Sequence, residues 1–265
     1  MRDELLLTAL LITLLLSVII LHKVRRMHIM AYRIESDLEK VTKEIAGLRD
    51  IKTELTNLYT QFQAYQDLVR LITPKKPLPL LRGWAASPDF LLEISRHTLS
   101  HQPKIILECS SGASTLALAR CCELNGFGHV YSLEHEESYA EQTRQRLRDQ
   151  GLDCWATVVD APLVEQPAIG GQRWYSLTNL QTEPESCELL VIDGPPSDTS
   201  QQARYPALPL LSKFLSGSCT IILDDAQRPD EQQAVKRWLA DFPAFTIEQL
   251  YCEKGCSKLT RKVNG

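Results

Sequence analysis

The chain has 265 residues, a formal net charge of −4, and a composition that is 44% hydrophobic and 23% charged. These proportions are ordinary for a globular protein and allow a sizeable core. The acidic balance supplies no broad positive field, which argues against nucleic acid as a partner.

Residues 5–21 form an uncharged, mostly aliphatic run. As a helix, a run of this length is at the short end of what crosses the roughly 30 Å hydrocarbon core of a bilayer. A cleaved signal peptide is the alternative, but no small-x-small cleavage site follows the run. The sequence therefore predicts a transmembrane anchor with a basic flank over residues 1–27.

Cationic residues flank this run unequally, because Lys23, Arg25 and Arg26 follow it and only Arg2 precedes it. The positive side of a single span favours the cytoplasm. We therefore expect a single-pass membrane protein whose remaining chain lies in the cytoplasm. The eight cysteines agree with this location, since they include no Cys-x-x-Cys pair and several lie in apolar runs, as buried thiols do.

Residues 28–72 carry apolar side chains at alternating spacings of four and three, beginning with Ile34, Leu38 and Val41. This pattern is typical of a coiled-coil seam and predicts a helix that forms a homo-oligomer. A competing seam through Ile51 and Leu58 indicates a shift of register. The alternative is one amphipathic helix that lies on the following domain.

Residues 73–79 contain three prolines, which end a helix because proline lacks a backbone donor and has a fixed φ. This segment is the expected linker before a domain over residues 80–265. In that domain, short β-rich runs alternate with helical stretches, a pattern typical of an α/β fold with a mostly parallel sheet. The expected strands are 104–108, 129–134, 154–159, 188–193, 219–223, 245–251 and 257–261, and the expected helices are 114–124, 139–150, 205–215 and 230–241.

Carboxylates stand at the ends of five successive predicted strands. Ligands of open α/β sheets bind beyond the carboxyl ends of the strands, and buried carboxylates are costly without partners. Each residue alone has a structural alternative as a helix cap or turn residue, but five together indicate a binding site. The residues are Glu108, Glu134, Asp160, Asp193 and the pair Asp224 and Asp225.

Each strand end has a chemical use. The small-residue loop from Ser110 to Ser114 allows backbone to approach a ligand and leads into a helix N-terminus. Glu134 is placed to accept hydrogen bonds from two ribose hydroxyls, and Asp160 from an adenine amino group. Asp193 is expected between this ligand and a second one.

Four motifs resemble those of class I S-adenosylmethionine-dependent methyltransferases. The run around Glu108, Ser110, Gly112 and Ser114 resembles the motif E-x-G-x-G-x-S. The other three lie later in the chain, and the resemblance covers roughly residues 80–261. They are Tyr-Ser-Leu-Glu134-His, Val-Ile-Asp193-Gly-Pro-Pro and Leu-Asp224-Asp225-Ala-x-Arg228.

The resemblance implies a Rossmann-like domain with a seven-stranded sheet that binds S-adenosylmethionine. It implies cofactor contacts from Glu108, Ser110, Gly112, Ser114, Glu134 and Asp160. For methyl transfer, where alignment of acceptor and methyl carbon is the main requirement, Asp193 and His135 are the candidate bases. Ser110 stands where the motif has its first glycine, so a positive φ there would strain the backbone.

Two features of the predicted site stay open. Asp193, Asp224 and Asp225 resemble in placement the acidic cluster with which cation-dependent O-methyltransferases hold Mg²⁺, so these residues are the candidate ligands of Mg²⁺ as a second cofactor. Arg204 and Arg228 are candidates for binding an anionic acceptor, and salt bridges to these carboxylates are the alternative.

The acceptor is expected to be a small or lipid-linked molecule, such as an envelope or glycan precursor, because of the predicted anchor. The alternative function is a non-catalytic coiled-coil scaffold with a degenerate cofactor-binding domain. A nicotinamide dehydrogenase is disfavoured, since residues 109–115 do not supply G-x-G-x-x-G after the first strand.

Overall fold

The computed structural model describes residues 2–81, 83–183 and 185–261. The chain divides into two compact units, one ending at Leu58 and the other beginning at Tyr59. This division lies before the expected linker at residues 73–79. The last four residues of the predicted domain, 262–265, lie outside the described residues.

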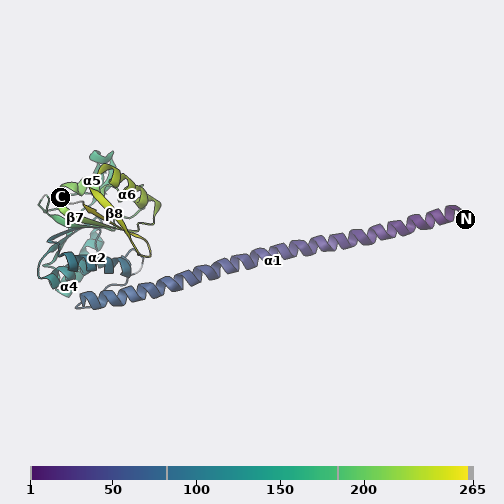
Figure 1. Cartoon of the computed structure of the whole chain (residues 1–265), viewed down its shortest axis with the longest axis horizontal. Coiled ribbons are helices and arrows are strands. Elements are labelled where there is room, and N and C mark those ends of the chain that lie inside the picture. The colour runs from purple at the N-terminus through teal and green to yellow at the C-terminus, as the bar shows by residue number, and fades with distance from the viewer. Residues whose placement is uncertain (1, 82, 184, 262–265) are drawn as a thin grey trace. The chain divides into compact units, whose positions relative to one another are not determined.

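The first unit is helical throughout its described residues. Helix α1 (Arg2–Ile72) runs without a break from the predicted anchor through the predicted coiled coil (Figure 1). Its apolar window has a mean hydropathy of 2.7, so by length and composition the helix is able to cross a membrane. The apolar side chains of the predicted seam, such as Leu38 and Leu48, are exposed in this chain.

The last turns of α1 belong to the α/β unit. Leu68 and Ile72 are fully buried in its core, together with Ala64. Burying each of the two large aliphatic side chains stabilises the fold by about 1.5–3 kcal/mol. The carbonyl of Ile72 also accepts a hydrogen bond from Nε of Arg120 at 2.9 Å. For this part of the helix, the alternative of an amphipathic helix lying on the domain describes the structure.

The second unit is built on a seven-stranded sheet in the order β3-β2-β1-β6-β7-β9-β8. All neighbouring strands are parallel except β9, which is antiparallel to β7 and β8. The predicted Rossmann-like fold with a mostly parallel seven-stranded sheet is confirmed. Its strands are β1 (Ile105–Cys109), β2 (His129–Glu134), β3 (Ala156–Asp160), β6 (Cys187–Ile192), β7 (Leu215–Asp224), β8 (Phe245–Leu250) and β9 (Cys256–Arg261).

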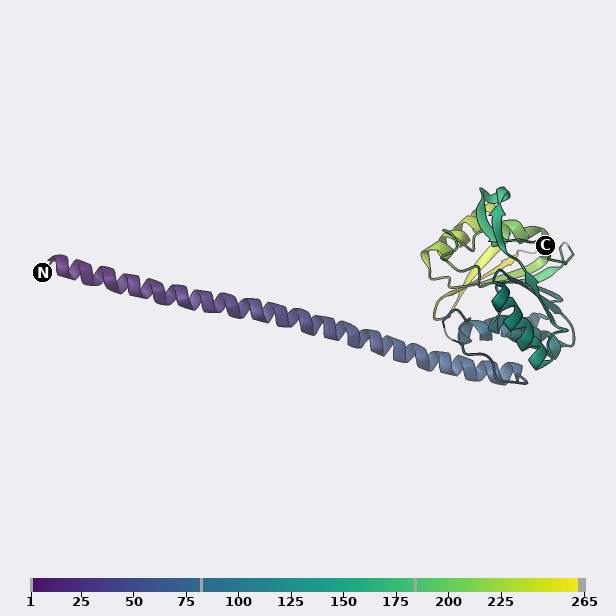
Figure 2. The same ribbon diagram turned by 180° about the vertical axis from the view of Figure 1, so that it is seen from behind.

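Helices cover both faces of this sheet, with α2 and α4 on one side and α5 and α6 on the other (Figure 1; Figure 2 shows the reverse view). Successive strand residues point to opposite faces, so Ile106 joins the core under α2 and α3 while Leu107 joins the core under α5 and α6. The helices are α2 (Pro88–His101), α3 (Ala113–Asn125), α4 (Glu137–Gln150), α5 (Ala207–Leu211) and α6 (Pro229–Asp241).

Four features differ from the prediction. Helix α2 was not predicted. The expected helix over 205–215 is wrong in its second half, because α5 ends at Leu211 and a single 3₁₀ turn, η2 (Ser212–Phe214), follows it. Leu215 then pairs with Cys187 of β6, so β7 begins four residues earlier than the predicted strand.

A two-stranded hairpin is the fourth difference. Strands β4 (Leu163–Gln166) and β5 (Gln172–Tyr175) pair antiparallel, with the 3₁₀ turn η1 (Pro167–Ile169) between them. The insertion places Trp174 and Tyr175 in the core on the α5 and α6 face. It therefore adds a tyrosine next to the strand ends that the predicted site did not contain.

Candidate active site

A cleft of about 1240 Å³ opens at the carboxyl ends of the central strands. Strand order reverses between β1 and β6, which is where ligands bind in open α/β sheets. Among the lining residues are Ser110, Gly112 and Ser114 after β1, Glu134 and His135 after β2, and Asp193 after β6. The volume exceeds the roughly 300–1,000 Å³ of a typical single-ligand pocket. It has room for two ligands side by side.

The loop after β1 has an unusual backbone. Ser110 has φ +122° and Gly112 has φ +145°, so both lie in the region that side chains disfavour. Position 110 therefore has the positive φ that favours glycine, as the motif led us to expect, and the serine there strains the backbone. Gly194 shows why the loop is tight, because a Cβ added to it would lie 3.1 Å from Cβ of Ser110 and 2.5 Å from the Tyr175 hydroxyl oxygen.

Glu108 lies beneath this loop and does not line the cleft. It is fully buried, and its Oε2 accepts hydrogen bonds from the hydroxyls of Thr115, at 2.6 Å, and Ser132. The Thr115 hydroxyl oxygen in turn accepts a hydrogen bond from the amide of Gly112 at 3.0 Å. Burial raises the pKa of Glu108, with hydroxyl hydrogen bonds opposing the rise. Glu108 thus supports the loop from behind.

Glu134 lines the cleft at the end of β2. Oε1 accepts hydrogen bonds from the amides of His135, at 2.9 Å, and Glu136, at 3.0 Å, and Oε2 accepts one from the Ser111 hydroxyl at 2.8 Å. Burial acts to raise the pKa of Glu134, but the close approach of His135 and these hydrogen bonds outweigh it and lower the pKa. The group is therefore an ionised acceptor at the edge of the cleft.

Two further predicted residues lie near Glu134 in sequence or in the sheet. Nδ1 of His135 is 3.1 Å from Oε1 of Glu134, and its ring packs edge-on against Tyr175. Asp160 pairs with Glu134 in the β2/β3 register, but its side chain is 58% exposed and forms an ion pair with Arg144. Asp160 is not among the described residues that line the cleft.

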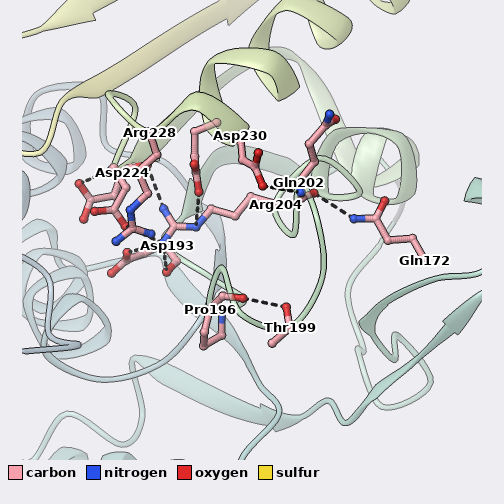
Figure 3. A network of polar contacts seen from close by, with 11 residues as sticks. Gln172, Asp193, Pro196, Thr199, Gln202, Arg204, Asp224, Arg228 and Asp230 are labelled. Atoms are coloured by element: carbon pink, nitrogen blue, oxygen red, sulfur yellow. Dashed lines mark hydrogen bonds and ion pairs between the residues drawn. The ribbon is translucent and has the colours of Figure 1, made fainter.

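The other half of the cleft holds a cluster of carboxylates around Arg204 (Figure 3). Nη2 of Arg204 lies 2.8 Å from Oδ2 of Asp225 and 3.4 Å from Oδ1 of Asp193, and Nε lies 3.7 Å from Oε1 of Glu231. Oxygen atoms of Asp193, Asp224 and Asp225 lie within 4.8 Å of one another. For Arg204, the alternative of a salt bridge to the carboxylates describes the structure.

Burial and mutual repulsion set the protonation of this cluster. Burial raises the pKa of Asp193 to about 6, with Arg204 opposing the rise and Asp225 adding to it. Burial also raises the pKa of Asp224 well above its ordinary value, and the charges of Asp193 and Asp225 raise it further. Oδ2 of Asp193 has no hydrogen-bond partner in the described part of the chain, so it is available to a ligand in the cleft.

The sequence did not indicate several lining residues. Tyr175 comes from the unpredicted hairpin, and Lys254 comes from the β8–β9 turn. Leu80 and Trp84, which is 76% exposed, give the cleft an apolar edge. A signal for Trp84 was present, because the run Trp84-Ala-Ala-Ser-Pro88-Asp resembles the same methyltransferase group, but nothing local assigned its side chain to this site.

Comparisons with known proteins support the assignment of the domain. Residues 107–226 match the model of a family described as a methyltransferase domain. The structure is similar to an O-methyltransferase from Bacillus cereus in complex with SAH, with a TM-score of 0.54 and 18% identity over 78% of this chain and 97% of the other. It is also similar to the SAH-bound methyltransferase PaMTH1 from Podospora anserina, with a TM-score of 0.53 and 15% identity over 76% and 88%.

No curated protein matches the sequence. The resemblance to class I methyltransferases that the motifs indicated is confirmed for the α/β domain by the matched family model and the fold.

Proposed function

We propose that the α/β domain transfers the methyl group of S-adenosylmethionine to an acceptor bound beside it in the cleft. The observation that carries the proposal is Glu134, an ionised carboxylate with a lowered pKa at the end of β2, next to the positive-φ loop after β1. A carboxylate there accepts hydrogen bonds from both ribose hydroxyls, while the loop and the N-terminus of α3 receive the amino-acid end of the cofactor. Asp160, at the end of β3, is the proposed contact to the adenine amino group.

The reaction needs a proton acceptor on the far side of the methyl group. An acceptor hydroxyl would give its proton to Oδ2 of Asp193 as its oxygen bonds to the methyl carbon and the carbon–sulfur bond breaks. The products are the methylated acceptor and S-adenosylhomocysteine (SAH). Alignment of the two ligands in one cleft supplies most of the rate enhancement. His135 is the other proposed base, although its contact with Glu134 favours a role in orienting the Glu134 carboxylate that binds the cofactor.

The acceptor is proposed to be lipid-linked. Leu80 and Trp84 place apolar surface at the edge of the cleft, and residues 5–21 supply an apolar segment long enough to anchor the chain. The cationic residues after that segment favour a cytoplasmic domain. The exposed apolar seam of α1 before residue 59 supports a homo-oligomer, since such a row of side chains is normally covered by another helix.

Calorimetric titration of the full chain in detergent with S-adenosylmethionine and SAH tests the cofactor part. We expect micromolar binding that weakens by about tenfold to a hundredfold in Glu134→Ala, because a charged hydrogen-bond acceptor contributes about 1.5–3 kcal/mol. The matched control is Glu141→Ala, an exposed carboxylate on α4. Asp160→Ala is expected to lose less affinity than Glu134→Ala. A folded chain that binds neither ligand would instead support the scaffold.

Orientation has a separate test. A cysteine-reactive probe that cannot cross membranes, applied to intact cells, should leave the exposed Cys154 unlabelled until the cells are opened. A Cys154→Ser variant controls for labelling of other thiols. Labelling of intact cells at Cys154 would place the domain outside and overturn the proposed location.

A further inference from the structure

An arginine lies where a divalent cation would have to bind in the acidic cluster. Oxygen atoms of Asp193, Asp224 and Asp225 are within 4.8 Å of one another, and oxygen ligands at such a spacing suit Mg²⁺. The guanidinium of Arg204 already contacts two of these carboxylates, at 2.8 Å from Asp225 and 3.4 Å from Asp193. The ligand set of a metal ion is therefore engaged by a side chain of the protein itself.

The backbone holds Arg204 in this position. Nη1 donates to the carbonyl of Asp224 at 2.9 Å, and Nη2 donates to the carbonyl of Asp193 at 2.9 Å. Carbonyl groups cannot rotate away as side chains can, and moving the arginine out would leave them buried without a donor. The Arg204 side chain is only 4% exposed, so these hydrogen bonds are largely shielded from competing water.

The contacts of Arg204 determine whether a divalent cation can bind to the acidic cluster. An ion that took Asp193 and Asp225 as ligands would lie beside a buried, permanently charged guanidinium, and it would replace charge-assisted hydrogen bonds that are already formed. Glu231 adds a further carboxylate, with its Oε1 atom 3.7 Å from Nε of Arg204. Arg228, 3.0 Å from Asp225, adds a second cation. The residues present do not fit Mg²⁺.

We propose that Arg204 takes the place of the divalent cation, so that methyl transfer by this domain needs no metal. The inference rests on the proposed function. Arg204 acts as a positioning residue, because it holds Oδ1 of Asp193 and leaves Oδ2 directed to the acceptor. A metal binds both oxygens of a vicinal diol, whereas this guanidinium is already committed to protein acceptors. The acceptor class is therefore one with a single reacting hydroxyl or other lone nucleophile.

Electron paramagnetic resonance of Mn²⁺ tests the proposal without an acceptor. In the full chain in detergent with SAH present, the signal of free Mn²⁺ should be unchanged up to about 1 mM, and SAH affinity should be the same with and without EDTA. Arg204→Met should bind Mn²⁺ at least about tenfold more tightly than the wild type, since the repelling charge is gone. Adding Asp224→Asn to that variant should abolish the new binding.

Each alternative result has a meaning. Sub-millimolar Mn²⁺ binding by the wild type that Asp224→Asn removes would overturn the inference, whatever the variants show. A folded Arg204→Met or Arg204→Gln that binds no Mn²⁺ would show that Arg204 does not stand in for the ion. Arg228→Met is the matched control and should gain no Mn²⁺ binding. Failure to bind SAH, with no Mn²⁺ bound, would overturn the proposed function and leave the electrostatic role of Arg204 standing.

Discussion

The two halves of the cleft hold their carboxylates in opposite ways. Glu134 accepts hydrogen bonds from two amides and a hydroxyl and lies 3.1 Å from the His135 ring, and these partners lower its pKa despite its burial. Asp193 and Asp224 lie among other carboxylates, their pKa values are raised, and one buried cation, Arg204, compensates them. In the first half, each partner of Glu134 forms its contact separately. In the second half, the protonation of each carboxylate depends on the others and on the single side chain of Arg204.

The largest effect is expected from removing that side chain. Arg204→Met should destabilise the chain by about 3–5 kcal/mol, because breaking one partner of a buried ion pair leaves uncompensated charge. Protonation of the buried carboxylates removes the uncompensated charge. The folded variant therefore binds more protons than the unfolded chain, and its free energy of unfolding falls as pH rises. Denaturant unfolding at pH 5.5 and pH 8 should show the greater loss at pH 8.

Arg228→Met is the control for this prediction. Arg228 touches the same Asp225 but is 43% exposed, so its loss should cost less than about 1 kcal/mol. Equal losses for the two variants, or a loss at Arg204 that does not change with pH, would contradict the description of a coupled cluster.

The next largest effect is on the rate of transfer. Asp193→Asn removes the proposed proton acceptor and should lower the rate by about 10²–10⁴-fold while SAH affinity stays within a few fold. Because the pKa of Asp193 is raised to about 6, the wild-type group is ionised above and protonated below that pH. The rate should therefore fall as pH drops through 6.

Transfer of labelled methyl groups into membrane extracts measures this rate. Glu134 has a lowered pKa and stays ionised over the same range, so SAH affinity should be constant between pH 7 and pH 5. A parallel fall in affinity and rate would mean that the two halves of the cleft titrate together, contrary to the comparison.

A smaller effect is expected in the cofactor loop. Ser110→Gly should stabilise the chain by about 1 kcal/mol, since glycine adopts a φ of +122° without the strain of a side chain. The opposite kind of change, Gly112→Ala, should destabilise the chain. The cause is the backbone φ of +145°, because among the described residues, chain neighbours aside, no atom lies within 4 Å of the added Cβ. Thermal unfolding distinguishes the two. No gain from Ser110→Gly would show that other contacts favour this conformation.

The smallest effect is expected at His135. His135→Gln should weaken SAH binding by less than about fivefold, because Glu134 keeps its hydrogen bonds from the Glu136 amide and the Ser111 hydroxyl. The transfer rate with saturating cofactor should not change. A rate loss of about a hundredfold or more would make His135 the base in place of Asp193.

Much of the fold was predictable because its signals are local. Apart from β7, each predicted strand of the sheet agrees with the observed one to within two residues, since short apolar runs and period-two alternation depend only on neighbours in sequence. The hairpin of β4 and β5 was missed because four-residue strands with half-exposed side chains resemble a loop. The division of α1 at residue 59 was missed because the change in the apolar pattern there was interpreted as a shift of register within one coiled coil.

The sequence by itself determined the α/β domain, the carboxylates at the ends of its strands, and the serine at a position that needs a glycine conformation. Only the tertiary structure decided that Glu108 supports the loop from below, that Tyr175 enters the cleft, and that Arg204 occupies the acidic cluster. The reason is physical. A helix or strand follows from periodicity along one segment, whereas a buried ion pair depends on distances between residues that only the folded sheet brings together.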